Sequence, residues 1–120
     1  MFLAAAQLTV PFFAIVLRKG YGLGAMVMTA GGFHAPVFNV AWPIGEFGAM
    51  GLESAVKLCY AKELAAQTQG TARDALYDQL VAQQYVAGHA LNMAATLELD
   101  AVIEPALTRD WLGRGLAAAS

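Results

Sequence analysis

Charged side chains are scarce in this chain of 120 residues, since seven basic and nine acidic residues make up only 13% of it. That is about half the usual share. The formal net charge of −2 gives no electrostatic basis for binding nucleic acid. A single cysteine excludes a disulfide framework and a zinc site built from cysteines, and it fits a reducing compartment. Apolar residues make up 58%, which excludes a disordered tail.

The charges avoid the front of the chain. Residues 1–45 contain only Arg18 and Lys19, which leaves two uncharged runs, Met1–Leu17 and Gly20–Gly45. Both are long enough to be considered as membrane segments. The first lacks the basic flank of a signal peptide, and the second holds glycines and prolines that would leave backbone groups unpaired in lipid. We therefore favour burial of the front half inside a larger assembly over a membrane hairpin.

The hydrophobic pattern predicts strands that alternate with helices. In the first half it predicts a helix over Met1–Thr9 that Pro11 ends, strands over Phe12–Leu17, Val37–Trp42 and Gly45–Met50, a glycine-containing corner over Arg18–Gly22, and a helix over Leu23–Ala30. In the second half it predicts helices over Leu52–Ala66, Ala72–Ala87, His89–Leu97 and Asp110–Ala118, and a strand over Asp100–Ile103. We expect Thr71 to cap the Ala72–Ala87 helix and Gly88 to end it. The pattern indicates an α/β architecture, and the sequence contains no internal repeat.

The segment Gly22-Leu23-Gly24-Ala25 joins a predicted strand to a predicted helix. Such a corner presents unpaired backbone N–H groups, and its small residues allow a substrate to approach the main chain. The chemistry that this arrangement serves best is stabilisation of a developing oxyanion. The alternative is a tight turn that needs glycine only for its dihedral angles. Neither a phosphate-binding Walker loop nor a complete dinucleotide fingerprint is present.

The other candidate residues have structural interpretations from their positions in the sequence. His34 and His89 have no partner at metal-ligand spacing, and Cys59 falls on the apolar stripe of its helix, where a packed thiol is expected. Met26, Met28 and Met50 fit core packing better than a pocket lining. We expect solvated or capping roles for three acidic residues that nothing in the sequence pairs: Glu46, Glu53 and Asp100.

Several of these segments occur in an order that resembles a known family. They are Arg18-Lys19, Tyr21-Gly22-Leu23-Gly24, Met28, Ala41-Trp42-Pro43, Met50-Gly51 followed by Glu53, and Asp100 through Arg109. The ordered set covers most of the chain and is similar to the carboxyltransferase (β) subunit of biotin-dependent acyl-CoA carboxylases. The resemblance implies a crotonase-like fold built of ββα units. It also implies that residues 1–120 are the later part of the second, C-terminal domain of such a subunit, without the N-terminal domain.

The implied reaction moves a carboxyl group from N-carboxybiotin to the α-carbon of a short-chain acyl-CoA. The resemblance assigns the backbone N–H groups of Leu23 and Gly24 to the oxyanion hole for the biotin enolate. It places Tyr21, Gly22, Ala25 and Met26 in the substrate-binding region, Met26 beside the acyl group. Leu23 departs from the glycine or alanine of many relatives, but only its N–H is needed.

The same resemblance implies several partners. Biotin is carried by a separate protein or domain, so a biotin carboxylase and biotin carboxyl carrier subunit are expected, together with a homo-oligomer of carboxyltransferase subunits whose active site forms between two subunits. We expect no metal, no nucleic acid and no membrane partner, and a cytoplasmic location.

Two alternatives stay open at the level of the sequence. The first is a crotonase-superfamily enoyl-CoA hydratase or isomerase, which would need a glutamate near the corner; Glu46 and Glu53 are the nearest. The second is a truncated, non-catalytic remnant that only associates with partners. We expect the isolated 120 residues to be inactive.

Overall fold

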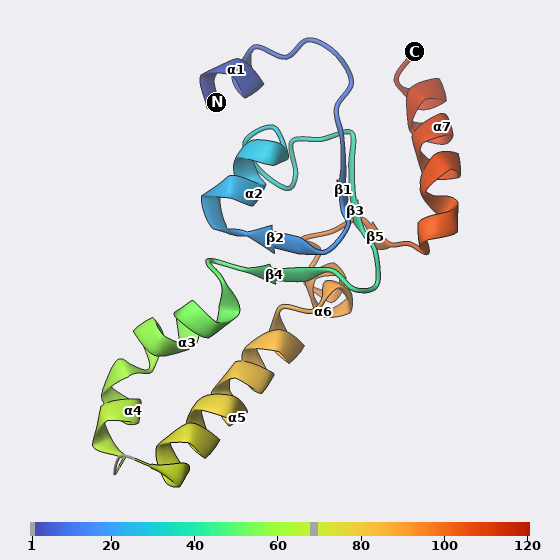
Figure 1. Ribbon diagram of the computed structural model, residues 1–120. Coiled ribbons are helices and arrows are strands. Elements are labelled where there is room, and N and C mark those ends of the chain that lie inside the picture. The colour runs from blue at the N-terminus through green and yellow to red at the C-terminus, as the bar shows by residue number, and fades with distance from the viewer. Residues whose placement is uncertain (1, 68–69) are drawn as a thin grey trace.

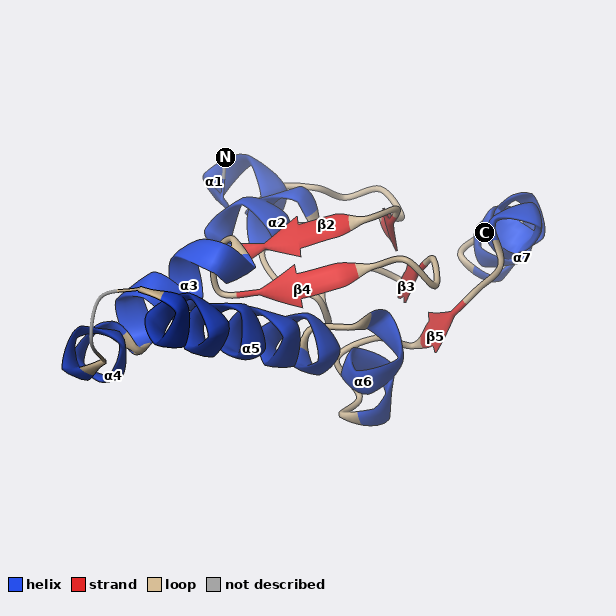
Figure 2. Ribbon diagram, turned by 60° about the horizontal axis from the view of Figure 1, so that its bottom comes forward, coloured by secondary structure: helices blue, strands red, loops and turns tan. Residues whose placement is uncertain are grey.

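The structure is a computed structural model that describes residues 2–67 and 70–120. Its strands form two parallel sheets (Figures 1 and 2). The first sheet has the order β1 (Phe13–Val16), β3 (Phe38–Ala41), β5 (Ala101–Val102), and the second pairs β2 (Lys19–Tyr21) with β4 (Glu46–Gly48). The helices are α1 (Phe2–Ala6), α2 (Gly22–Met28), α3 (Leu52–Cys59), α4 (Ala61–Ala66), α5 (Thr71–Ala87), α6 (Ala90–Ala95) and α7 (Thr108–Ala118), with a 3₁₀ turn, η1, at Pro105–Leu107.

Two successive ββα units build this arrangement. The first is β1–β2–α2 and the second is β3–β4–α3. The units lie in parallel, because Phe13 of β1 pairs with Phe38 of β3 and Lys19 of β2 pairs with Glu46 of β4. The chain thus contains a structural repeat that leaves no repeat in the sequence, and the expected α/β architecture of ββα units is confirmed.

The core lies around β3, whose four residues are all buried. On one side Phe38, Val40 and Ile103 pack with the partly buried rings of Phe13 and Trp111. On the other side a second cluster forms from Ala41, Phe47, Ala90 and Leu99. A strand covered on both faces needs a nearly continuous apolar run, and VFNVAW has one that only Asn39 interrupts, which explains why the sequence predicts a strand there.

Three expectations about local structure are wrong or incomplete. The predicted corner over Arg18–Gly22 contains a strand, β2, because β4 lies beside it and pairs with it in parallel. The predicted Leu52–Ala66 helix bends at Tyr60, whose angles are φ −108° and ψ 24°, and α4 then buries Leu64. Cys59 is exposed rather than packed, since it is the last residue of α3, at this bend.

The cap of α5 differs as well. Thr71 is the first residue of the helix, and Gly70 takes the cap position with φ +128°. The amides of Arg73 and Asp74 donate to the Gly70 carbonyl, so no side chain is needed there. Gly88 ends the helix as expected. Met1, the first residue of the predicted N-terminal helix, lies outside the described residues, and that helix ends earlier than predicted, at Ala6.

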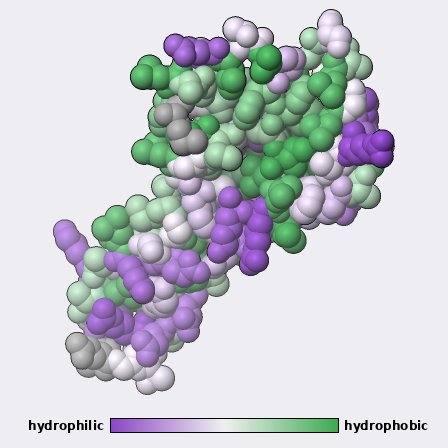
Figure 3. Space-filling view, turned by 45° about the horizontal axis from the view of Figure 1, so that its top comes forward, coloured by the Kyte–Doolittle hydropathy of each residue, from purple (hydrophilic) through white to green (hydrophobic). Residues whose placement is uncertain are grey.

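The molecule is elongated, with extents of 61 × 32 × 19 Å, because α3, α4 and α5 form an arm that projects from the sheets (Figure 1). Hydrophobic residues gather over the part that carries the sheets, and hydrophilic residues over the arm (Figure 3). Exposed apolar side chains of the charge-poor front half include Leu3, Val10 and Met28. Among the helices of residues 2–67 and 70–120, none has the length and apolar character that crossing a bilayer requires.

Candidate active site

The candidate site lies where β2 passes into α2. Tyr21 has extended backbone angles, φ −107° and ψ 131°, and Gly22 follows it with φ +58°. A side chain at Gly22 would be strained by this angle, and its Cβ would lie 2.6 Å from the carbonyl oxygen of Ala49. The backbone conformation by itself therefore requires glycine at position 22. This agrees with the alternative given above, a tight turn that needs glycine for its dihedral angles.

The first amides of α2 lie beside open space. In the described part of the chain, the Tyr21 side chain makes no capping hydrogen bond to this helix. The N–H groups of Leu23 and Gly24 belong to the first turn, where an α-helix supplies no backbone acceptor. A Cβ at Gly24 would meet no atom within 4 Å, and the Leu23 side chain is exposed. Two backbone donors without a backbone acceptor thus lie on exposed residues at the positive end of the helix.

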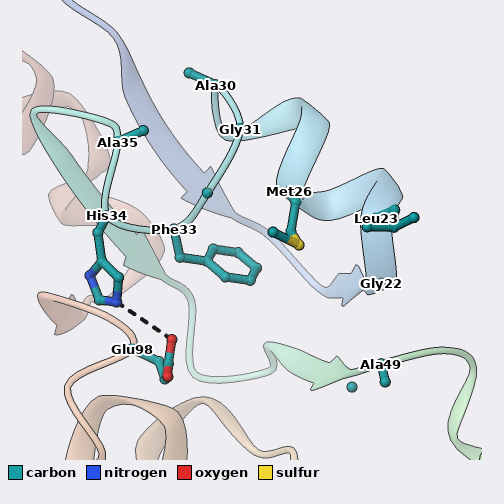
Figure 4. A pocket seen from close by; sticks show the side chains of 12 residues that line it. Gly22, Leu23, Met26, Ala30, Gly31, Phe33, His34, Ala35, Ala49 and Glu98 are labelled. Carbon is teal, nitrogen blue, oxygen red and sulfur yellow. Dashed lines mark ion pairs between the residues drawn. The ribbon is translucent and has the colours of Figure 1, made fainter. Parts of the chain in front are cut away.

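A cavity of about 750 Å³ adjoins one side of α2 (Figure 4). Its walls come from α2, from the segment 30–35 and from the end of β4. The side chains of Met26 and Phe33 point into it and toward one another. At the rim, His34 Nε2 lies 3.6 Å from Glu98 Oε2; the His34 side chain is largely exposed and the Glu98 side chain about half exposed. The cavity therefore offers an apolar interior with one polar pair at its edge.

A second cavity, of about 830 Å³, lies on the other side of α2, against β1 and β2. The two cavities divide the candidate residues. Gly22, Leu23 and Met26 line the first, whereas Tyr21, Gly24 and Ala25 line the second. The structure thus brings all six to one helix start but distributes them over both of its sides.

Glu46 contacts the last residue of β2 and the residue that precedes this strand. The Tyr21 hydroxyl donates to Glu46 Oε2 at 2.8 Å, and Arg18 Nε lies 3.5 Å from Glu46 Oε1. Burial and this hydrogen bond raise the pKa of the Tyr21 hydroxyl far above its usual value, so it stays protonated as a donor. Glu46 therefore anchors Tyr21, the residue that precedes the glycine turn. The solvated or capping role expected from the sequence did not include this contact.

The two other acidic candidates also have specific partners. Glu53 accepts a hydrogen bond of 2.7 Å from the Tyr85 hydroxyl, which lowers the pKa of the Glu53 carboxyl and raises that of Tyr85. Asp100 accepts a hydrogen bond of 2.8 Å from the backbone amide of Asn39. Both partners come from elements distant in sequence, so the expectation that nothing pairs these acids is wrong.

The expectations for the histidines and methionines have different outcomes from residue to residue. His89 has the expected structural role, because its Nδ1 accepts from the Leu91 amide at the start of α6. His34 is exposed and pairs with Glu98, a partner with no signal in the sequence. Met26, Met28 and Met50 are all exposed, so core packing is wrong for the three of them, and Met26 lines the cavity. Within residues 2–67 and 70–120, no group of three or more His, Cys, Asp or Glu is arranged to hold a metal ion.

Comparison with known proteins places the whole chain in one family. Residues 1–120 match the carboxyl transferase domain. The beta6 subunit of a biotin-dependent acetyl-/propionyl-coenzyme A carboxylase from Mycobacterium tuberculosis is 37% identical over 118 residues, which are 97% of this chain and 24% of that subunit. The propionyl-CoA carboxylase beta chain of Saccharopolyspora erythraea is 32% identical over 121 residues, covering 94% of this chain and 21% of that one. The chain thus spans about a quarter of the length of the curated relatives it matches.

Solved structures agree with this match. A single-chain, multi-domain long-chain acyl-CoA carboxylase is 55% identical with a TM-score of 0.79, over 94% of this chain and 11% of that one. The transcarboxylase 12S hexamer core, with methylmalonyl-coenzyme A bound, is 30% identical with a TM-score of 0.84, over 98% of this chain and 22% of that one. The matched regions of these neighbours are carboxyltransferase domains, which have a crotonase-like fold. This chain has the same fold and corresponds to part of such a domain. The chain belongs to the carboxyl transferase domain family, the family of the acyl-CoA carboxylase β subunits.

Proposed function

We propose that this chain forms part of the active site of a biotin-dependent carboxyltransferase, which moves a carboxyl group from N-carboxybiotin to the α-carbon of an acyl-CoA. The observation that carries the proposal is the pair of amides without a backbone acceptor, those of Leu23 and Gly24, at a turn that Gly22 makes possible. Membership of the carboxyl transferase domain family supports it. We also propose that residues 1–120 are the later part of the C-terminal domain of such a subunit.

The start of α2 fits the ureido group of biotin. The space beside Gly24 is free, since a Cβ there would meet nothing within 4 Å, and a planar polar group can reach the main chain through it. When bound, carboxybiotin supplies the carboxyl group and a basic ureido nitrogen. The amides of Leu23 and Gly24 donate hydrogen bonds to the ureido oxygen, where negative charge develops. Fixed donors of this kind stabilise charge without reorganising during the reaction.

Tyr21 and Glu46 keep this donor pair in place. Tyr21 directly precedes the turn, and its hydroxyl is held at 2.8 Å by the Glu46 carboxylate. The raised pKa of Tyr21 keeps the hydroxyl protonated, and that hydrogen bond intact, in alkaline solution as well as at neutral pH. Ala25 follows Gly24 in α2 and lines the second cavity, and its methyl side chain is small enough to leave that cavity open. The chain itself therefore contributes positioning and hydrogen-bond donors rather than an acid or base.

The acyl group of the CoA thioester is placed in the cavity that Met26 lines. Its interior is apolar, and an unbranched thioether side chain adapts to alkyl groups of different shape. We propose a short-chain acyl-CoA as the preferred substrate. The 55% identical relative is named a long-chain acyl-CoA carboxylase, so the assay compares acetyl-, propionyl- and palmitoyl-CoA.

The expected partners follow from the same proposal. They are a biotin carboxylase with a biotin carboxyl carrier, and further carboxyltransferase subunits in a homo-oligomer. The names of relatives as biotin-dependent carboxylases, and the hexamer assembly of the transcarboxylase core, support this. A cytoplasmic location suits the exposed thiol of Cys59, because a reducing compartment keeps it from oxidising.

The test uses the complete carboxyltransferase that contains this chain, with its biotin carrier. Gly24→Pro removes one donor N–H and should abolish carboxyl transfer while the subunits still assemble. Gly24→Ala is the matched control, because it keeps the N–H and adds a Cβ to open space. Carboxylation of acyl-CoA is measured with labelled bicarbonate, and assembly by size-exclusion chromatography. Transfer at the normal rate in assembled Gly24→Pro would refute the oxyanion assignment.

A second candidate function is hydration of an enoyl-CoA, which the Glu98–His34 pair at the rim of the first cavity favours. A carboxylate and an imidazole at 3.6 Å can relay a proton to and from water. Glu46 and Glu53, the glutamates nearest the corner in sequence, are instead engaged by Tyr21 and Tyr85. Hydration of crotonyl-CoA that Glu98→Gln abolishes, without carboxylation in the presence of the carrier, would favour this alternative.

A further inference from the structure

Phe33 lines both of the cavities beside α2. The first cavity, of about 750 Å³, is lined by Phe33 together with Met26, and the second, of about 830 Å³, is lined by Phe33 together with β1 and β2. No other described residue lines both. Phe33 therefore lies where the two open cavities adjoin, and its side chain is called the partition below.

The Phe33 ring packs against the buried core on one side. The rings of Phe33 and Phe47 meet edge to face, with centroids 5.8 Å apart and an interplanar angle of 69°. Phe47 is buried, and Phe33 packs partly buried against the cluster that Phe47 forms with Ala41, Ala90 and Leu99. An aromatic ring anchored in this way has few alternative positions.

The opposite wall is adaptable. Met26 faces Phe33 across the first cavity and is about one-third exposed. Its side chain has three rotatable bonds and no polar anchor, so it can move aside for a ligand. Of the two side chains that point into the cavity, Phe33 therefore sets its depth.

We propose that Phe33 limits the length of the acyl chain that this site accepts. The inference rests on the proposed function, since it takes the first cavity as the acyl site. With the ring present, an alkyl chain that enters past Met26 stops at the partition. Without it, the chain continues into the second cavity, where Phe12, Ile15 and Val16 offer apolar walls. The substrate class at issue is straight-chain fatty acyl-CoA.

The size of the effect follows from the hydrophobic term. Each methylene removed from water favours binding about fourfold. A chain that gains two or three buried methylenes in the joined cavity should therefore gain roughly tenfold or more. We expect Phe33→Ala to raise the ratio of kcat/KM for palmitoyl-CoA to that for propionyl-CoA by at least about tenfold.

The experiment measures kcat/KM in the complete carboxyltransferase with its carrier, for straight-chain acyl-CoA from acetyl-CoA to palmitoyl-CoA. Phe33→Leu keeps an apolar contact with Phe47 and should shift the preference less far than Phe33→Ala. Phe33→Trp should shift it toward shorter chains. Phe12→Ala is the matched control, because Phe12 lines only the second cavity and the partition stays in place. Calorimetric binding of the same acyl-CoA series gives the preference independently of turnover.

The outcomes separate this inference from the proposed function. An unchanged chain-length preference in folded Phe33→Leu and Phe33→Trp, by turnover and by binding, would overturn the role of Phe33 and leave carboxyl transfer standing. An equal shift in Phe12→Ala would also overturn it, since any enlargement would then suffice. A wild-type enzyme that binds and turns over no acyl-CoA would refute the proposed function itself.

Discussion

Helix α7 packs against the first sheet at Gly115, and adding one methyl group there, by substitution with alanine, tests this contact. A Cβ added at Gly115 would lie 2.7 Å from ring atoms of both Phe13 and Phe38. Two residues earlier in the same helix, a Cβ at Gly113 would meet no atom within 4 Å. Gly115→Ala and Gly113→Ala therefore make the same chemical change in one helix, and only the first adds an atom to a packed interface.

The magnitude follows from two opposing terms. Alanine is favoured over glycine inside a helix by about 1 kcal/mol, so Gly113→Ala should raise the free energy of unfolding by that amount. At Gly115 the same gain is offset by overpacking, which costs about 1–3 kcal/mol in a well-packed core. The rings cannot yield easily, because Phe38 is only 7% exposed and lies edge to face against Trp111 at 5.5 Å. Gly115→Ala should therefore lower stability, by about 1 kcal/mol.

The assay is urea unfolding of wild type and both variants, followed by circular dichroism and tryptophan fluorescence. Because helix propensity cancels between the two alanine variants, the difference between them isolates the packing term, about 1–3 kcal/mol. Two variants that stabilise the protein equally would show that α7 does not pack on Phe13 and Phe38, and the description of the core would then be wrong.

Further predictions concern the corner between β2 and α2. Tyr21→Phe should lower the free energy of unfolding by about 1 kcal/mol, because Glu46 Oε2 loses its hydrogen-bond donor and the carboxylate keeps only the ion pair with Arg18. Since the folded state raises the pKa of Tyr21, wild-type stability from this group is complete below pH about 10 and falls above it; the wild-type advantage in urea midpoint should shrink there. Gly22→Ala should cost about 2 kcal/mol or more, from its positive φ and the Ala49 oxygen, and an unaltered melting temperature would contradict this. Met26→Asp should change the ratios of kcat/KM among short acyl-CoA substrates, whereas constant ratios would remove Met26 from the acyl site.

The sequence predicts the buried elements better than the exposed ones. Strand β3 is covered on both faces, and its apolar segment, interrupted only by Asn39, is a strong local signal. Strand β2 has no such run: Lys19, Gly20 and Tyr21 form a strand only because β4 lies beside them. Its existence depends on a tertiary contact, so a local interpretation as a corner is the natural error.

The same distinction applies to the site. The glycine turn at Gly22 and the donors that follow it depend on local backbone chemistry, and the spacing of small residues indicates them. The pairs of side chains do not leave such a signal. Tyr21 and Glu46 are 25 residues apart and Glu53 and Tyr85 are 32 apart, and both meet only after the strands and helices have packed.

The projecting arm leaves this chain with more surface than a compact protein of its mass. The accessible surface is 7797 Å², whereas a compact monomer of 12.6 kDa has about 6,200 Å². The excess, roughly 1,600 Å², is about twice the area that a standard protein–protein interface buries on each partner. Helix α5 contributes to it, since none of its residues is fully buried. Its amides should therefore exchange with solvent hydrogen through local opening of the arm, while the amides of β3 exchange only when the whole core unfolds.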